Sequence, residues 1–224
     1  LQRLGRLHDA ARARQAFQWA RQAGFDNISL DLMMWLPGQS PGEWLESVEA
    51  LVGLEPDHAS LYLLELYPHA PLREEMARAR LSQAPDDDAA EMYEAAMARL
   101  EAAGYRQYEI SNVSRPGRES RHNLKYWTDG EWLGFGCGAG STSGGVRWKN
   151  VSDTEDYLRR AARGVDVVSE REVLPPAARL GEAIFMGLRL RDGIDLDAVA
   201  GRYGVDVWRR YGDALGPYRE AGLL

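Results

Sequence analysis

The first half of the chain alternates between segments with the apolar spacing of helices and short apolar runs typical of strands. In chain order, these segments fall at 9–25, 27–34, 41–54, 55–66, 87–103 and 105–112. Strands that alternate with helices usually lie parallel in one sheet, with each helix packed across it. No Gly-rich dinucleotide-binding fingerprint accompanies the predicted strands, so we expect part of an α/β barrel.

Local signals mark the ends of the first two helices. Gly24 is placed to end the first, and Ser40, Pro41 and Glu43 have the pattern of a capping box at the start of the second. The strand-like run at 27–34 is mostly apolar. We therefore expect this strand to be buried on both faces.

The pattern changes after residue 112. Residues 113–150 are rich in Gly, Ser and aromatic side chains and are expected to form loops with short strands. A short helix is expected at 152–164, with Ser152 as its N-cap. Three further helices with short connections are expected from Leu174. The sequence thus predicts three regions, at 1–150, 151–173 and 174–224, of which the last is a small, mostly helical domain.

Composition excludes several classes of protein. The 224 residues are 45% hydrophobic and 27% charged, as in globular proteins, and no apolar run approaches the roughly 20 residues of a membrane helix. The net charge of −7 argues against nucleic acid as a partner. Cys137 is the only cysteine, so no internal disulfide can form and a single thiolate cannot hold an iron–sulfur cluster.

The cysteine content and the start of the chain lead to two expectations. A single cysteine suits a reducing cytosol, so a cytoplasmic location is expected. The sequence begins at Leu1 rather than at a methionine. We therefore expect it to be an excerpt of a longer protein.

Polar residues follow the predicted strands, at the edge where parallel sheets usually bind ligands. Asp31 lies inside an apolar run, so it is either a structural aspartate bonded to a backbone amide or a ligand-binding group. Glu65 follows the next strand, and Glu109, Ser111 and Asn112 end a third. Any one of these polar groups could simply be a strand end exposed to solvent. Polar groups at the ends of three strands in register instead favour a binding site.

Two further segments carry candidate chemistry. Six glycines within 134–145 permit either a turn between strands or a close approach of the backbone to a ligand, and Cys137 among them is expected to be a small packed side chain. The run RHNLKYW at 121–127 is expected to form a strand, with His122 and Tyr126 on the same face. His122 is then a metal or haem-iron ligand, a proton donor, or a core histidine bonded to a carbonyl.

These motifs, in this order, resemble the radical SAM proteins of the oxygen-independent coproporphyrinogen oxidase group, and within it the HemW-type haem chaperones. The resemblance is carried by LGRLH, AGFDNISLDLM, LPGQ, PDHASLYLLELYPHAPL, AGYRQYEISNVSRPGRESRHNLKYW, LGFGCGAGS and GVRWKNV. The run HNLKYW matches the HNxxYW signature of the HemW-type subgroup. The resemblance implies the C-terminal part of a partial, TIM-like (β/α)6 barrel followed by the family's small helical domain.

The resemblance also implies cofactors. In this family a CxxxCxxC motif, which this chain lacks, holds a [4Fe–4S] cluster that binds S-adenosylmethionine (SAM). By position, the expected SAM contacts are Arg6, Asp31, Glu65, Ala139 and Gly140. The expected haem contacts are His122, Asn123, Tyr126 and Trp127, with His122 as an axial iron ligand. The chain departs from the family pattern at Trp35, in place of glycine, and at Gly140, in place of histidine; we expect a narrower SAM pocket with one polar contact fewer.

The function implied is haem binding and delivery to haem-accepting proteins, some of them membrane-associated. The alternative is an oxygen-independent coproporphyrinogen III oxidase, an oxidative decarboxylase, from which the HNxxYW signature separates this chain. Radical SAM modification of tRNA is disfavoured by the acidic balance and the lack of a basic stripe. Without the cluster motif, the chain alone is expected to run no radical chemistry.

Overall fold

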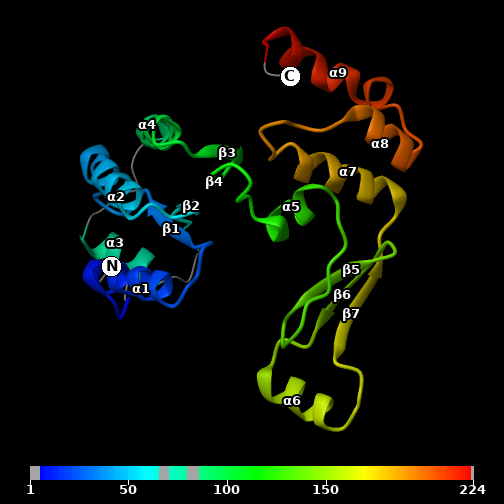
Figure 1. Ribbon diagram of the computed structural model, residues 1–224. Coiled ribbons are helices and arrows are strands. Elements are labelled where there is room, and N and C mark those ends of the chain that lie inside the picture. The colour runs from blue at the N-terminus through cyan, green and yellow to red at the C-terminus, as the bar shows by residue number, and fades with distance from the viewer. Residues whose placement is uncertain (1–5, 66–70, 80–85, 223–224) are drawn as a thin grey trace. The chain divides into compact units, whose positions relative to one another are not determined.

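The computed structural model describes residues 6–65, 71–79 and 86–222 (Figure 1). Internal contacts divide the chain into two compact units, one ending at Ser120 and one beginning at Arg121. We call them the N-terminal unit and the C-terminal unit. The expected division into 1–150, 151–173 and 174–224 stays a prediction.

The N-terminal unit has the predicted alternation of helices and strands. Its elements are α1 (Ala10–Gln22), β1 (Ser29–Met34), α2 (Pro41–Leu54), β2 (His58–Leu63), α3 (Pro71–Ala79), α4 (Asp86–Ala102), β3 (Arg106–Glu109) and β4 (Asn112–Ser114). The capping box before α2 is confirmed: the Glu43 amide donates to Ser40 Oγ at 3.2 Å, and the Ser40 amide donates to Glu43 Oε2 at 2.8 Å. These two bonds satisfy orphan donors and fix where the helix begins.

The sheet of this unit has the order β1-β2-β4-β3. β1 and β2 are parallel as predicted, whereas β4 runs antiparallel to both of its neighbours. The expectation of one continuous strand at 105–112 was wrong, because the chain reverses after Glu109 and returns as β4 between β2 and β3. The Glu109 carboxylate accepts from the Ser111 amide at 2.9 Å, which stabilises this tight reversal.

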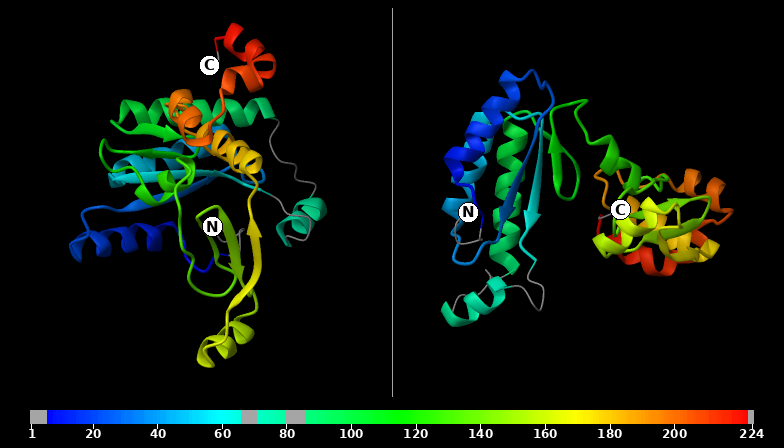
Figure 2. Two further views of the ribbon diagram at one scale, coloured as in Figure 1. Left: turned by 90° about the vertical axis from the view of Figure 1, so that its right-hand side faces the viewer. Right: turned by 90° about the horizontal axis from the view of Figure 1, so that it is seen from below.

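One face of the sheet is apolar and is covered by α2 and α4 (Figure 2). Trp44 on α2 is fully buried there, and its indole nitrogen donates to the Met92 carbonyl of α4 at 2.8 Å. The expectation that the first strand is buried on both faces was wrong: Ser29 and Asp31 are exposed. Alternate residues of a strand point to opposite faces, and the described helices cover only the face opposite Asp31.

The C-terminal unit combines a three-stranded antiparallel sheet, β5-β6-β7, with helices. Its elements are α5 (Arg121–Trp127), β5 (Gly140–Ser143), β6 (Val146–Asn150), α6 (Thr154–Ala162), β7 (Val168–Val173), α7 (Pro176–Gly187), α8 (Leu196–Tyr203) and α9 (Val207–Glu220). The three helices expected after Leu174 are present. No described helix is long and apolar enough to cross a membrane.

Two local expectations for this unit were wrong. The run 121–127 forms the helix α5 rather than a strand. The N-cap of α6 is Asp153 rather than Ser152, because the Asp153 carboxylate accepts from the Asp156 amide at 2.7 Å and so satisfies a free donor of the first turn.

Candidate functional site

Helix α5 places two of the expected haem contacts against each other. His122 Nε2 and the Tyr126 hydroxyl oxygen are 3.1 Å apart, and the two rings meet edge-on with centroids 5.0 Å apart. Residues four apart lie on the same side of a helix, one turn from each other. His122 is exposed, so its imidazole is open to a ligand from solvent.

Aromatic contacts extend from Tyr126 in two directions. The centroid of the Tyr126 ring lies 4.5 Å from that of Trp132, which follows α5, and 6.4 Å from that of Trp127. The Arg189 guanidinium lies 4.4 Å above the Trp127 ring, a cation–π contact between α5 and the end of α7. The segment therefore presents a histidine at one end of a set of packed aromatic rings.

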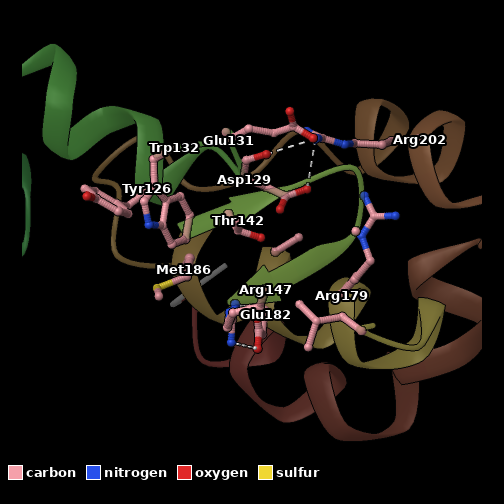
Figure 3. Close-up of a pocket in the computed structure, with 14 residues that line it drawn as sticks. Tyr126, Asp129, Glu131, Trp132, Thr142, Arg147, Arg179, Glu182, Met186 and Arg202 are labelled. Carbon is pink, nitrogen blue, oxygen red and sulfur yellow. Dashed lines mark hydrogen bonds and ion pairs between the residues drawn. The ribbon is translucent and has the colours of Figure 1, made fainter. Parts of the chain in front are cut away.

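A small hollow lies beside these rings (Figure 3). Its volume is about 50 Å³, and Tyr126 and Trp132 form its aromatic side while Thr142 and Met186 line it from β5 and α7. A cavity of about 150 Å³ holds a single benzene ring. The hollow therefore accommodates a group of a few atoms and is far too small for a porphyrin ring.

Two ion pairs lie in the lining of this hollow. Arg147 and Glu182 form a two-bonded pair at 3.0 and 2.6 Å. The Asp129 carboxylate lies 3.2 Å from the Arg202 guanidinium and accepts from the Tyr203 hydroxyl. Burial, together with this bond to Asp129, raises the pKa of Tyr203 to about 12, so its hydroxyl stays a donor at neutral pH.

The N-terminal unit offers a second candidate region, the sheet face opposite the core. Paired residues of neighbouring strands point to the same face, so the register places two rows of polar side chains there. We call this the polar face. Its rows are Ser29, His58 and Ser114, and Asp31, Ser60 and Asn112.

His58 is held in the first of these rows. Its Nδ1 lies 2.8 Å from Ser29 Oγ, and its Nε2 lies 2.8 Å from the Tyr108 hydroxyl. Burial lowers the pKa of His58, and the charges of Asp31, Glu109 and Glu119 act against that shift. The net effect keeps the imidazole neutral over a wider pH range.

Each row also contains a buried polar atom that lacks a partner. Glu109 is fully buried and accepts from the Asn112 side-chain amide. Within the described residues, Asn112 Oδ1 and Ser114 Oγ are buried and have no hydrogen-bond partner. Buried polar groups in native proteins are usually satisfied, so these two atoms indicate a bound water or ligand on the polar face.

The glycine-rich segment is shaped by its own backbone. A Cβ built at Gly134 would lie 2.3 Å from the Gly140 carbonyl oxygen, so a side chain at 134 is excluded. A Cβ at Gly140 would meet nothing within 4 Å. The expectation that Cys137 is a packed side chain was wrong: it is exposed, and its Sγ lies 3.4 Å from Thr154 Oγ1.

Comparison with known proteins agrees with this architecture. Residues 174–224 match the family described as HemN C-terminal domain. The solved structure of coproporphyrinogen III oxidase (HemN) from Escherichia coli, described as a radical SAM enzyme, matches 99% of this chain and 55% of its own, with a TM-score of 0.79 at 19% identity. This match confirms the predicted fold class, part of a radical SAM barrel with a helical C-terminal domain.

Curated relatives are more similar in sequence. The heme chaperone HemW of Bacillus subtilis is 35% identical over 224 residues, which are all of this chain and 59% of that protein. HemW of Mycobacterium tuberculosis is 40% identical over 194 residues, 86% of this chain and 50% of that protein. The chain is therefore similar to HemW heme chaperones over most or all of its own length. It spans about half the length of the curated relatives it matches.

A vertebrate relative carries a different printed name. The bovine "Radical S-adenosyl methionine domain-containing protein 1, mitochondrial" is 36% identical over 203 residues, 87% of this chain and 46% of that protein. The relatives of this chain therefore carry two kinds of printed name, one for a heme chaperone and one for a radical SAM domain.

The four expected haem contacts all lie on α5, and of these the His122 and Tyr126 side chains contact each other. The five expected SAM contacts divide between the units. Arg6, Asp31 and Glu65 are exposed residues of the N-terminal unit, and Ala139 and Gly140 belong to the C-terminal unit. Sequence reasoning missed Trp132 and the arginines around the hollow, because no local spacing links them to α5.

Proposed function

We propose that this chain, like the HemW heme chaperones it resembles, takes part in binding haem and delivering it to haem-accepting proteins, including membrane-associated ones, in the cytoplasm. The observation that carries the proposal is the exposed α5 helix, on which His122 and Tyr126 are in contact beside packed aromatic rings. A haem needs an iron ligand and apolar contacts for its ring. In this proposal His122 meets the iron, and Asn123, Tyr126 and Trp127 lie along the ring.

We further propose that SAM binds through Asp31, Arg6, Glu65, Ala139 and Gly140. The unpartnered Asn112 Oδ1 and the exposed Asp31 carboxylate, which share one row of the polar face, suit a ligand with hydroxyl and ammonium donors such as SAM. Arg6 supplies a guanidinium that can pair with the SAM carboxylate in two parallel bonds. SAM supplies a sulfonium whose cleavage is the chemistry of this superfamily.

The residues of this chain do not fit a [4Fe–4S] cluster by themselves. Cluster ligation takes several thiolates, and Cys137 is the only cysteine. No group of three or more metal-binding side chains occurs among the residues that the structure describes. We therefore propose that the cluster ligands lie outside these 224 residues, and we derive no step through the cluster from them.

One observation favours a second function. The similarity to HemN from E. coli in fold is consistent with oxidative decarboxylation of coproporphyrinogen III. The two functions differ in what happens to the porphyrin, because a chaperone releases it unchanged. Modification of tRNA stays disfavoured by the net charge of −7.

A paired assay separates these functions. The protein carrying this chain is incubated with haem and an apo-haemoprotein, and in parallel with coproporphyrinogen III, SAM and a reductant. The proposal predicts a haem-bound absorption band and transfer to the acceptor, with no decarboxylated product. Decarboxylation without haem transfer would establish the oxidase instead.

A further inference from the structure

We propose that Arg179 binds a carboxylate of the porphyrin, a propionate, in the hollow beside α5, while the macrocycle lies outside against Tyr126 and Trp132. This inference rests on the proposed haem function. The size of the hollow sets its occupant: about 50 Å³ accepts a carboxyl group but excludes a tetrapyrrole.

Arg179 differs from the other two arginines around the hollow. Arg147 is paired with Glu182, and Arg202 is paired with Asp129. Among the described residues, Arg179 has no hydrogen bond or ion pair; its guanidinium lies 5.8 Å from the Tyr203 ring centroid. An arginine carries five N–H donors in a planar fork that matches a carboxylate.

The acidic side chains that line the hollow already accept hydrogen bonds from other groups of the protein. Beyond the two ion pairs, Glu131 accepts from Ser143 Oγ at 2.8 Å and from the Gly144 amide. Those two bonds, together with the nearby charges of Arg179 and Arg202, lower the pKa of Glu131, so it stays an acceptor without a proton to donate. Of the three arginines in the lining, Arg179 is the one without a hydrogen bond or ion pair among the described residues, and its donors suit an anion.

Gly145 keeps space beside this guanidinium. It has φ +76, a conformation that side chains rarely adopt, and a Cβ there would lie 3.2 Å from Arg179 Nη1. A residue with a side chain at this position would crowd the arginine. The turn between β5 and β6 thus leaves the guanidinium accessible from the hollow.

The remaining contacts match the other parts of a haem. Figure 3 shows Tyr126 and Trp132 on one side of the hollow and Arg179 on another. Tyr126 also contacts His122. These groups match the parts of haem in turn. The imidazole suits the iron, the two aromatic rings suit the flat macrocycle, and the guanidinium suits a propionate.

Metal-free mesoporphyrin and its dimethyl ester test this assignment, because neither depends on an iron ligand. Porphyrin fluorescence is titrated with the unmodified protein, Arg179→Gln and the control Arg210→Gln, which removes an exposed arginine lying 5.5 Å from the Tyr211 ring centroid. We expect the unmodified protein and the control to prefer the free acid about tenfold. Arg179→Gln should lose that preference and bind the ester unchanged.

The outcomes separate the two levels of the proposal. Retention of the free-acid preference in Arg179→Gln overturns the role of Arg179 while leaving haem binding intact. If a folded Arg179→Gln protein loses affinity for the free acid and for the ester equally, the role of Arg179 is also overturned. The arginine would then stabilise the binding surface rather than bind the carboxylate. If the unmodified protein binds neither porphyrin and no haem, the proposed function itself falls.

Discussion

His122 Nε2 lies 3.1 Å from the hydroxyl oxygen of Tyr126, one turn further along α5. The nitrogen that usually ligates haem iron is therefore already engaged, and binding iron there requires this contact to open. A hydrogen bond of this kind contributes about 0.5–1.5 kcal/mol. The competition between Tyr126 and iron gives the first prediction.

Tyr126→Phe keeps the aromatic ring and removes the competing hydroxyl. We expect haem affinity to rise about threefold, measured by absorbance titration, because Nε2 no longer has to leave a partner. Tyr157→Phe, a half-buried tyrosine of α6, is the matched control and should leave affinity unchanged. A fall in affinity for Tyr126→Phe would mean that the hydroxyl orients the histidine instead.

Trp35 has φ +66, in the left-handed region that favours glycine. A non-glycine residue there costs about 1–2 kcal/mol. We expect Trp35→Gly to be about 1 kcal/mol more stable than Trp35→Ala in urea unfolding, since both lose the indole but only the glycine is free of this strain. Equal stability of the two variants would show that the backbone relaxes at this position.

Gly140→His introduces the side chain that the resemblance implies at this position. Because a Cβ there meets nothing within 4 Å, we expect a folded protein with several-fold tighter SAM binding, measured by calorimetry. Gly134→His is the contrast. Its Cβ would overlap the Gly140 carbonyl oxygen, so the melting temperature should fall by several degrees. Unchanged SAM binding in Gly140→His would remove this loop from the site.

Asp31→Asn tests the polar face. Asp31 is exposed, so the substitution should change the free energy of unfolding by no more than about 0.5 kcal/mol. SAM binding should nevertheless weaken at least tenfold, since a charged acceptor is lost. Asp26→Asn, another exposed aspartate of the same unit, serves as control. Equal SAM affinity in both variants would exclude Asp31 as a contact.

The buried His58 predicts a pH dependence of stability. Its pKa is lowered in the folded protein, so the unfolded chain binds more protons as the pH falls below the usual histidine value of about 6.5. The free energy of unfolding should therefore be constant well above pH 6.5 and decrease as the pH falls through about 6.5 toward the lower pKa of the folded protein. His58→Gln should flatten this slope in urea unfolding, whereas the exposed His8→Gln should retain it.

The sequence predicted the long elements better than the short ones. The helices α1, α2 and α4 have sustained apolar spacing and clear end signals, and the structure confirms them. The segment 105–112 contains a two-strand reversal without Gly or Pro to mark it, because the Glu109 side chain stabilises the turn. Strand β7, with the sequence VSEREV, lacks an apolar alternation and is defined by its pairing with β6.

The candidate site was predictable only in part. His122 and Tyr126 share a face whether 121–127 is a strand or a helix, because a spacing of four is even and is also about one helical turn. Their shared face was therefore expected despite the wrong element, whereas their contact depends on the helix, because residues four apart in a strand lie about 13 Å from each other. Arg179 reaches the same region from α7, and only the three-dimensional fold brings it there.

The most direct measurement of the haem proposal is a spectral titration with His122→Ala, with His8→Ala as the matched control. Binding of haem by the unmodified protein and by the control, together with at least a tenfold weaker and spectrally altered complex for His122→Ala, is the predicted result. An unchanged affinity and absorption spectrum in folded His122→Ala would contradict the account, because α5 would then not supply the iron ligand.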